Sequence, residues 1–288
     1  MLRSAVIESG EATDATLRTA VRRGDLRRIA RGVYSSADLP TDYQERCVEY
    51  RQRVVASAAA SRGRIVSHQS AAVLLDIPLL SPDMDAVHFS NARGSGSHLR
   101  TVHVHPARID SEELITVDGI RVTSPARTAV DVARSSSFAQ GVCAMDSALQ
   151  HGATMRELRT AVQKCKGRTG VNRARRALQE TSELAQSIGE SYSRILMLDW
   201  PEIPEPRLQH EFLDGHGLFI ARTDFDWDGT VVGEFDGRDK IAREQSLWKE
   251  KVREDKLRAL GITVVRWYWE DLLHPSRLRI KLRRALAL

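Results

Sequence analysis

The chain has 288 residues, 42% of them hydrophobic and 28% charged, which is the composition of an ordinary soluble globular protein. Its net charge of +5 favours a polyanionic partner only weakly, and no apolar run reaches the ~18 residues that a membrane-spanning helix needs. The first residues lack the apolar stretch of a signal peptide, so no membrane partner is expected. The three cysteines are scattered without CxxC spacing, which argues against a structural zinc site and indicates a reducing cytoplasm.

The first predicted element is a helix followed by a basic β-hairpin, in residues 13–36. Thr13 can cap the helix, and the sequence around Gly24 ends it before two short strands. A helix followed by a basic hairpin is the pattern of a winged helix, in which basic residues face DNA phosphates. The residues that we expect to bind DNA in this way are Arg23, Arg27, Arg28 and Arg31. The alternative is a solvated basic surface.

The middle region, residues 45–181, is predicted to combine helices with strands. Ser124 and Pro125 carry the cap and first-position signals of a helix start. Arg127 and Asp131 then stand at i and i+4 of that helix, where we expect a surface ion pair. Two or three further helices follow, with a basic run that either tracks a nucleic-acid backbone or is a solvated helix. The run consists of Lys164, Lys166, Arg168, Arg173, Arg175 and Arg176.

Several histidines stand on the predicted strands of this region. His103 and His105 fall on one face of a strand, and His88 stands on another strand. A metal cluster is one interpretation of this pattern. Exposed strand histidines are the favoured interpretation, because no carboxylate or cysteine of suitable spacing accompanies them. His68, at the start of a short helix, is expected to be a packing or capping residue.

The most informative stretch is residues 223–237, which read as two short strands joined by a tight turn. Phe225 and Trp227 alternate with aspartates, which is the period of two that a half-buried strand shows. Asp228 and Gly229 form a strong hairpin signal, because glycine tolerates a positive φ at this position. The stretch therefore predicts a hairpin with acidic residues on both strands.

The register of this hairpin decides whether its acids meet. With a loop of two or four residues, Glu234 would point away from the side of the sheet that carries Asp224. With a loop of three residues, Trp227 pairs with Val231 and Asp224 pairs with Glu234. We predict the three-residue loop, because it is the register that places Asp224, Glu234 and Asp236 on one face.

Acids on adjacent strands repel one another unless a positive charge lies between them. Asp224, Glu234 and Asp236 could hold Mg²⁺ or Mn²⁺, because these ions prefer oxygen ligands. Such a metal lowers the pKa of bound water and polarises a phosphate, which is the chemistry of phosphodiester hydrolysis. The alternative is a solvated hairpin with a polar outer face.

The C-terminal region predicts a mixed sheet with helices on its faces. A helix that contains Glu190 precedes a strand at residues 207–212, and the hairpin follows. A long charged helix is expected at residues 244–260 and ends at Gly261. A buried strand at residues 262–267 and a last helix complete the order of elements.

This order and several sequence blocks resemble the PD-(D/E)XK nuclease superfamily, in the branch similar to very-short-patch-repair endonucleases. The blocks that carry the resemblance are residues 232–240, 250–261 and 264–267. The resemblance implies that Asp224 is the motif aspartate and Glu234 the acid of the ExK half. Asp236 stands where that superfamily has its lysine, so Lys240 or Lys251 would take over the lysine's role.

The chemistry of phosphodiester hydrolysis gives roles to further residues. A lysine near the metal would orient the attacking water or neutralise charge in the transition state. Glu190, on the first helix of this region, would accept a metal-bound water. Arg266 would contact a DNA phosphate, and a strand arginine paired with a carboxylate is the alternative.

Three blocks in the first half of the chain are similar to AbiEi-type antitoxins. They are Leu26–Tyr34, which resembles the wing of the N-terminal domain, and Ser67–Pro78 and Val122–Ala133, which resemble segments that follow it. The resemblance implies a unit that binds DNA and represses its own operon.

The predicted fold class is α/β multidomain. We expect a winged-helix-like module in residues 1–44, an α+β region in residues 45–181, and a restriction-endonuclease-like mixed sheet flanked by helices in residues 182–288. The predicted function is a DNA-binding protein with a metal-dependent endonuclease domain, in phage defence or a toxin–antitoxin system. The alternative is a catalytically degenerate antitoxin-type repressor, which Asp236 at the lysine position favours.

Overall fold

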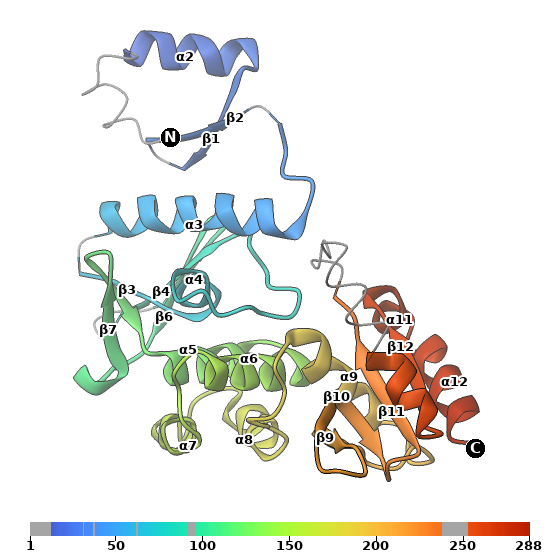
Figure 1. The fold of residues 1–288 in the computed structure, drawn as a ribbon. Helices are drawn as coiled ribbons and strands as arrows, with labels where there is room; N and C mark the ends of the chain where they lie inside the picture. Colours follow the sequence, from blue (N-terminus) through green and yellow to red (C-terminus); the bar gives the residue numbers. More distant parts are fainter. Residues whose placement is uncertain (1–12, 31, 37, 62, 92–95, 238–252) are drawn as a thin grey trace. The chain divides into compact units, whose positions relative to one another are not determined.

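The computed structural model in Figure 1 describes the chain except for residues 1–12, 31, 37, 62, 92–95 and 238–252. The chain divides into two compact units, residues 1–178 and residues 179–288. Sheets of two, six and four strands, together with helices, make it a mixed α/β protein. Within the described residues, no helix combines the length and the hydrophobicity that crossing a membrane requires.

The N-terminal unit starts with the predicted helix and basic hairpin. The elements are α2 (Asp14–Arg23), β1 (Leu26–Ala30) and β2 (Val33–Ser36), with β1 and β2 paired antiparallel. The Thr13 side chain accepts the backbone N–H of Thr16, and Gly24 ends the helix with a φ of +81°. Both end signals of this helix are therefore confirmed.

A six-stranded sheet forms the centre of the N-terminal unit, in the order β5-β6-β4-β3-β8-β7. Its strands are β3 (Ile65–Val66), β4 (Val87–Asn91), β5 (Ser97–Leu99), β6 (Val102–Pro106), β7 (Leu114–Val117) and β8 (Ile120–Thr123). β4 is parallel to β6 and β3 is parallel to β8, whereas β3 and β4 are antiparallel. The antiparallel pair of β3 and β4 therefore joins one half of the sheet, β5-β6-β4, to the other half, β3-β8-β7.

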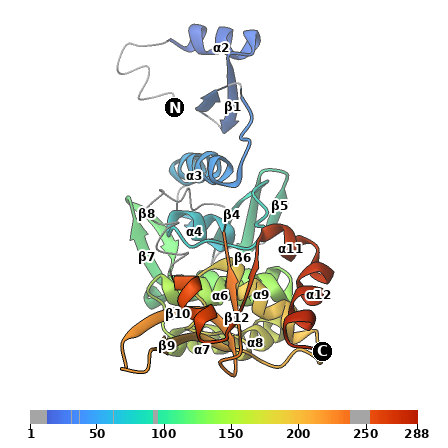
Figure 2. The same cartoon turned by 45° about the vertical axis from the view of Figure 1, so that its right-hand side comes forward.

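Helices cover this sheet. The long helix α3 (Tyr43–Ala60) contacts both the hairpin and the sheet, and α4 (His68–Leu74) lies beside β4, as Figures 1 and 2 show. Tyr50, Leu74 and Phe89 share one buried core. The other helices are the short 3₁₀ turn η1 (Ser111–Glu113), α5 (Pro125–Ser135), α6 (Phe138–Gln150), α7 (Met155–Lys164) and α8 (Val171–Gln179).

Helix α5 begins as predicted, but its ion pair is not on the surface. Ser124 caps the helix, and Pro125 occupies its first turn. Arg127 and Asp131 are each only 1% exposed, with Arg127 Nε 2.8 Å from Asp131 Oδ2. Arg127 Nη1 also lies 3.1 Å from Glu113 Oε1, and Arg134 pairs with Asp131. The surface assignment was wrong because i,i+4 spacing shows that two side chains are neighbours, not which way they face.

Replacing Arg127 with methionine should destabilise the N-terminal unit by about 3–5 kcal/mol, because the buried carboxylates of Asp131 and Glu113 lose their main partner. Hydrogen exchange in α5 measures this loss. The matched control is Arg159→Met on the exposed face of α7, which should change stability by no more than about 0.5 kcal/mol. Equal protection of α5 in both variants would contradict the assigned role of Arg127.

The C-terminal unit contains a four-stranded mixed sheet in the order β12-β11-β10-β9. Its strands are β9 (Arg207–Leu213), β10 (Phe219–Trp227), β11 (Val231–Phe235) and β12 (Thr263–Trp267). The first three form an antiparallel meander, and β12 is parallel to β11. A parallel pair needs a crossover connection, and the described part of that connection ends in a helix at residues 253–259.

Three further helices belong to this unit, namely α9 (Ile188–Leu198), α11 (Trp269–Leu273) and α12 (Pro275–Ala285). The predicted last helix is thus two helices, because Pro275 begins a new one. Figure 2 shows α11 and α12 next to each other, and both contact β12. Most of the helix predicted at residues 244–260 lies outside the described residues.

The two faces of this sheet have separate cores. Val231 and Val265 pack with Trp267 and with side chains of α9, α11 and α12. The next residues along the strands, Val232 and Val264, belong to a second core with Leu257. Successive side chains on a strand point to opposite faces, so the helix at residues 253–259 covers the face opposite α9.

Gly233→Ala should destabilise the C-terminal unit by about 1–3 kcal/mol. A Cβ atom at this position would lie 2.6 Å from Cζ3 of Trp267 and 3.1 Å from Cζ3 of Trp227, and both rings are buried. All five tryptophans lie between residues 200 and 269, so tryptophan fluorescence during urea unfolding reports on this unit. Gly237→Ala is the control, since its nearest contact would be an ordinary 3.6 Å.

Candidate functional site

The hairpin that joins β10 to β11 has the predicted register. Trp227 pairs with Val231, so the loop has three residues. Asp228 and Gly229 both have a positive φ, of +50° and +69°. A three-residue loop of this kind therefore forms where the Asp-Gly signal predicted it.

This register brings two of the predicted acids together. Phe225 pairs with Gly233, which is the last pair of the β10–β11 ladder on the side of Asp224, and beyond it the backbone N–H of Phe235 donates to the Asp224 side chain. Glu234 in turn pairs with Arg266 on β12. Glu234 lies against the helix at residues 253–259 through Arg253, whereas Asp224 is linked through Gln209 to Glu190 of α9.

Asp224 is held by two hydrogen bonds. The backbone N–H of Phe235 donates to Oδ2 at 3.0 Å, and the Gln209 side chain donates to Oδ1 at 3.2 Å. The same Gln209 nitrogen also donates to Glu190 Oε2 at 3.0 Å. Burial, and then the negative charge of Glu190, raise the pKa of Asp224 to about 6. Asp224 therefore titrates close to neutral pH.

Glu190 has a structural role beside this acid. It stands in the first turn of α9, where it accepts the backbone N–H of Gln186 at 2.9 Å and the hydroxyl of Ser187 at 2.7 Å. A carboxylate at a helix N-terminus is favourable, because the unpaired N–H groups there carry partial positive charge. The start of α9 therefore fixes a second negative charge next to Asp224.

Glu234 is compensated by arginines. Both of its oxygens accept from Arg253 Nη2 at 2.8 Å, and Arg266 Nη2 lies 3.4 Å away. Burial raises the pKa of Glu234, and the two arginines oppose that shift. Arg266 also pairs with Glu254 at 3.0 Å. In this structure Arg266 is thus paired with carboxylates, which was the alternative to phosphate contact.

Of the remaining predicted catalytic residues, Asp236 is among the described residues. Asp236 follows β11, is partly buried, and donates its backbone N–H to the Trp267 carbonyl at 2.9 Å. Lys240 and Lys251 lie outside the described residues. Among the described residues, the side chains whose ligand atoms all lie within 4.8 Å of one another form a group of histidines, not of acids. The binding of Mg²⁺ or Mn²⁺ by Asp224, Glu234 and Asp236 stays a prediction.

The predicted DNA-binding arginines of the hairpin differ in their partners. Arg23 and Arg28 are exposed. Arg27 instead forms an ion pair with Glu49 on α3 and donates to the carbonyl of Asp38 at 3.1 Å. Arg31 lies outside the described residues. Arg23 and Arg28 are therefore the side chains best placed to contact DNA.

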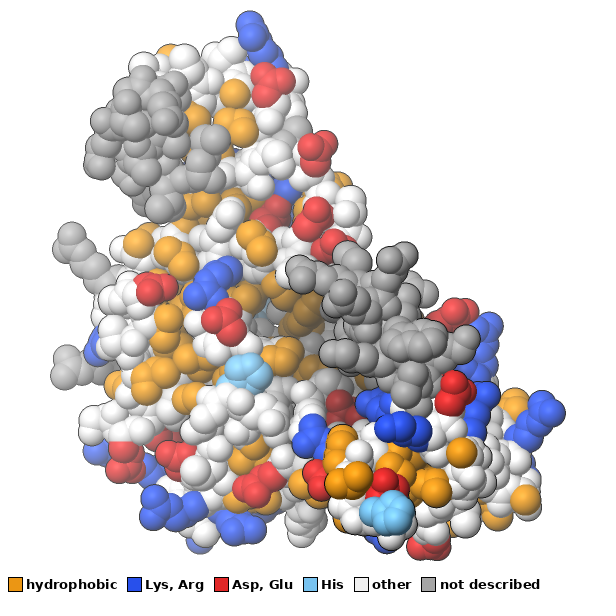
Figure 3. Space-filling model, in the orientation of Figure 1, with side chains coloured by type: hydrophobic (Ala, Val, Ile, Leu, Met, Phe, Trp, Pro, Cys, Tyr) orange, Lys and Arg blue, Asp and Glu red, His pale blue; other side chains and the backbone are white. Residues whose placement is uncertain are grey.

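Several side chains of the basic run between Lys164 and Arg176 form ion pairs or hydrogen bonds with other residues of the N-terminal unit. Lys164 pairs with Asp110 at 2.9 Å, and Arg168 donates to a backbone carbonyl at 3.1 Å. Arg173 donates to the Ser136 carbonyl at 2.6 Å. Basic and acidic side chains are mixed at this end of the unit in Figure 3. These contacts favour the structural interpretation of the run.

One part of the chain is similar to a known protein domain. Residues 92–180 match the AbiEi antitoxin C-terminal domain. This AbiEi-like segment runs from β5 to α8, and it contains the block Val122–Ala133 but not the hairpin block Leu26–Tyr34. The resemblance to AbiEi antitoxins is therefore supported in the middle of the chain.

Two curated relatives are similar over a longer stretch. They are the uncharacterized protein Rv2248 of Mycobacterium tuberculosis strain H37Rv and the uncharacterized protein MT2308 of strain CDC 1551. Each is 34% identical over 173 residues, which is 59% of this chain and 63% of the relative. The chain thus spans less than two thirds of the length of these relatives.

Sequence reasoning missed several residues of both units. Gln209, which holds Asp224, belongs to no motif, and Arg253, which holds Glu234, lies in the block of residues 250–261 but was given no role there. Both roles depend on strands and helices that meet only in the fold. His88 was expected to be exposed, yet it is buried beside His105. His68 was expected to be a packing or capping residue, and it is buried in the same group, one residue after the N-cap Ser67. The parallel pairing of β4 with β6 brings these rings together, and no spacing in the sequence reveals it.

Asp224→Asn should stabilise the metal-free C-terminal unit above pH 6 by about 2 kcal/mol. The pKa of Asp224 is raised from 3.8 to about 6 in the folded state, so the unfolded chain ionises first. Wild-type stability therefore falls as pH rises from about 4 to about 6 and stays lowered above that range. The asparagine variant lacks this loss.

Urea unfolding followed by tryptophan fluorescence in EDTA, at pH 4 and pH 8, checks this expectation. Asp228→Asn in the exposed hairpin loop is the control, because it makes the same chemical change away from the buried acids. An Asp224→Asn variant that is no more stable than wild type at pH 8 would contradict the raised pKa.

Proposed function

We propose that this chain acts on DNA in a toxin–antitoxin or phage-defence setting, and that its C-terminal unit hydrolyses phosphodiester bonds with a divalent metal ion. The AbiEi-like segment supports the setting. The exposed arginines of the N-terminal hairpin, Arg23 and Arg28, are the proposed DNA contacts. The enzymatic part of the proposal depends on the acids of the C-terminal unit.

The observation that carries the enzymatic proposal is the mutual repulsion of Glu190, Asp224 and Glu234, which are partly or fully buried. Burial and the charge of Glu190 raise the pKa of Asp224 to about 6, and the charge of Asp224 contributes to the raised pKa of Glu234. Burying like charges together is unfavourable without a cation. The oxygen donors of these carboxylates fit Mg²⁺ or Mn²⁺.

The order of elements gives further support. Helix α9, the meander β9–β10–β11, a helix and the parallel strand β12 follow the order that the resemblance to PD-(D/E)XK nucleases implies. Asp224 stands on the second strand and Glu234 on the third, where that resemblance places the motif acids.

In this proposal the residues of the chain have distinct tasks. Asp224 and Glu234 would hold the metal, which supplies an activated water and polarises the phosphate. Gln209 positions Asp224 and links it to Glu190, which is in turn held by the start of α9. Arg253 compensates Glu234 and can shift its hydrogen bonds to a phosphate oxygen when DNA is bound.

A second candidate function is a regulator without catalytic activity. Arg253 occupies both oxygens of Glu234, so this acid is already neutralised by the protein itself. Asp236 also stands in place of the lysine that the nuclease resemblance calls for. In this alternative the chain binds DNA as an antitoxin-type repressor, and the ion pairs of the C-terminal unit are structural.

Cleavage assays separate these two functions. The full-length protein should cut supercoiled plasmid or single-stranded DNA with Mg²⁺ or Mn²⁺ and not with EDTA. Asp224→Asn and Glu234→Gln should each lower the rate by at least about 100-fold, because each removes a metal-binding carboxylate. Asp228→Asn, an exposed aspartate of the same hairpin, should cut at the wild-type rate.

Tryptophan fluorescence shows whether the variants are folded, because all five tryptophans lie in the C-terminal unit. Wild-type protein that binds DNA in a mobility-shift assay but cuts nothing with either metal would support the regulator instead. Cleavage that survives in both acid variants would show that Asp224 and Glu234 are not the catalytic site.

A further inference from the structure

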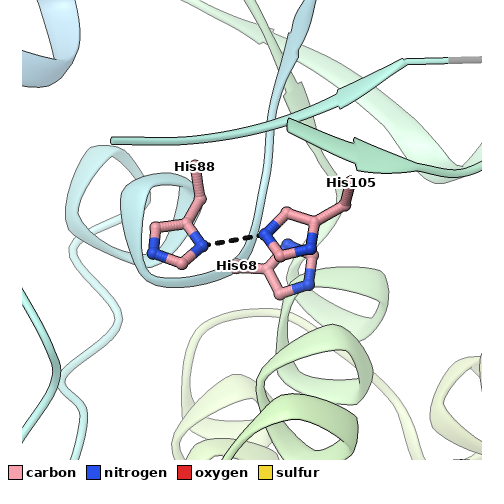
Figure 4. A group of neighbouring side chains, drawn as sticks. All are labelled: His68, His88 and His105. Carbon is pink, nitrogen blue, oxygen red and sulfur yellow. Dashed lines mark hydrogen bonds between the residues drawn. The ribbon is translucent and has the colours of Figure 1, made fainter. Parts of the chain in front are cut away.

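Three histidines of the N-terminal unit form a compact group that the proposed function does not use. His68 stands at the start of α4, His88 on β4 and His105 on β6 (Figure 4). One ring nitrogen from each lies within 4.8 Å of the others. The group is assembled from three separate elements, so it depends on the folded state.

The spacing of the rings is close to that of a metal site. His88 Nδ1 and His105 Nε2 are 3.0 Å apart, as the dashed line in Figure 4 shows. The ring of His68 stacks on that of His105, with centroids 3.8 Å apart. Two imidazole nitrogens on a tetrahedral ion with Zn–N bonds of 2.0–2.1 Å are about 3.3 Å apart. Only a small movement would therefore admit an ion between these nitrogens.

The histidine group is shielded from water. His68 is 3% exposed, His88 is 6% exposed and His105 is half buried. His88 Nε2 has no hydrogen-bond partner among the described residues. That atom lies on the side of the ring away from Nδ1, the nitrogen that faces His105 in Figure 4.

Neighbouring residues orient the rings and favour positive charge there. The hydroxyl of Ser67 lies 3.0 Å from His68 Nδ1, and Ser90 donates to Ser67 at 2.9 Å. The carboxylate of Asp131 favours positive charge on His68 and His105. Outer partners of this kind fix the ring orientation of histidine ligands.

Two more histidines connect the group to solvent. His103 lies with its ring centroid 5.0 Å from that of His88, and the His98 centroid is 4.6 Å from that of His103. His98 is exposed, on strand β5. The row of histidine rings therefore extends from the buried group to the surface of the sheet.

We propose that His68, His88 and His105 bind a divalent first-row transition metal, with Zn²⁺ as the expected ion. Three neutral imidazoles suit zinc, whereas Mg²⁺ and Ca²⁺ prefer oxygen ligands. Three protein ligands leave a fourth position for water or another donor. The ion would tie the start of α4 to β4 and β6, and so connect the AbiEi-like segment with the strands that precede it. This site is independent of the proposed metal site in the C-terminal unit.

Titration of the chelator-stripped full-length protein with zinc chloride in a calorimeter tests the site. One equivalent per chain should bind, and His88→Gln and His105→Gln should each weaken binding by at least about 100-fold, because each removes one of three ligands. His151→Gln is the matched control, an exposed histidine of the same unit, and should bind as wild type does. Substitution with Co²⁺ should give the visible absorption bands of a tetrahedral nitrogen-ligated ion, which both ligand variants lose.

Far-UV circular dichroism identifies a variant that fails to fold. Because His105 is only half buried, His105→Gln is the decisive variant if the change at the fully buried His88 disrupts the unit. Wild-type protein that binds no stoichiometric Zn²⁺, or a folded His105→Gln variant that binds it as tightly as wild type, would overturn the proposal.

Discussion

The pairing of Trp227 with Val231 is the constraint on which the C-terminal unit depends. A strand alternates its side chains between two faces, so a shift of one residue would send Glu234 to the opposite core. The three-residue loop fixes the face of the sheet to which each side chain of β11 points. Asp228 and Gly229 form this loop by adopting a positive φ, which both residue types tolerate. The register sets the face to which Glu234 points, whereas the partners of the two acids come from α9, β9, β12 and the helix at residues 253–259.

The two acids that the hairpin brings together are compensated differently. Glu234 has arginines on both sides, one from the helix at residues 253–259 and one from β12. Asp224 has a backbone N–H and an amide as partners, with Glu190 nearby. The site therefore carries an uneven distribution of charge, with the uncompensated negative charge on the side of Asp224 and α9. A cation would find its most favourable position there.

Local signals in the sequence predicted the local structure well. Thr13 and Gly24 marked the ends of α2, Ser124 and Pro125 the start of α5, and Asp228 with Gly229 the hairpin, because each acts through backbone conformation within a few residues. The metal and the nuclease activity expected from the acids are predictions that the fold does not test.

Predictions that needed long-range information failed. Arg127 and Asp131 are paired as expected, but their depth depends on helices and strands far away in the sequence. A cluster of His88 with His103 and His105 was considered but exposed histidines were favoured, because the parallel pairing of β4 with β6 and the burial of His88 are not visible in the sequence. Burial and parallel pairing are set by the whole fold, and spacing along the chain carries little information about either.

The order of the six-stranded sheet sets the minimum size of a stable fragment. β5, β6, β7 and β8 belong to the AbiEi-like segment, but β4 and β3 come from the preceding residues and lie between β6 and β8. An excised piece of residues 92–180 would therefore hold two separate strand pairs, each with an unpaired edge where its inner neighbour belongs. Unpaired strand edges tend to pair with other chains, which favours aggregation. The boundaries of the AbiEi-like segment therefore do not coincide with the boundaries of a unit that can fold.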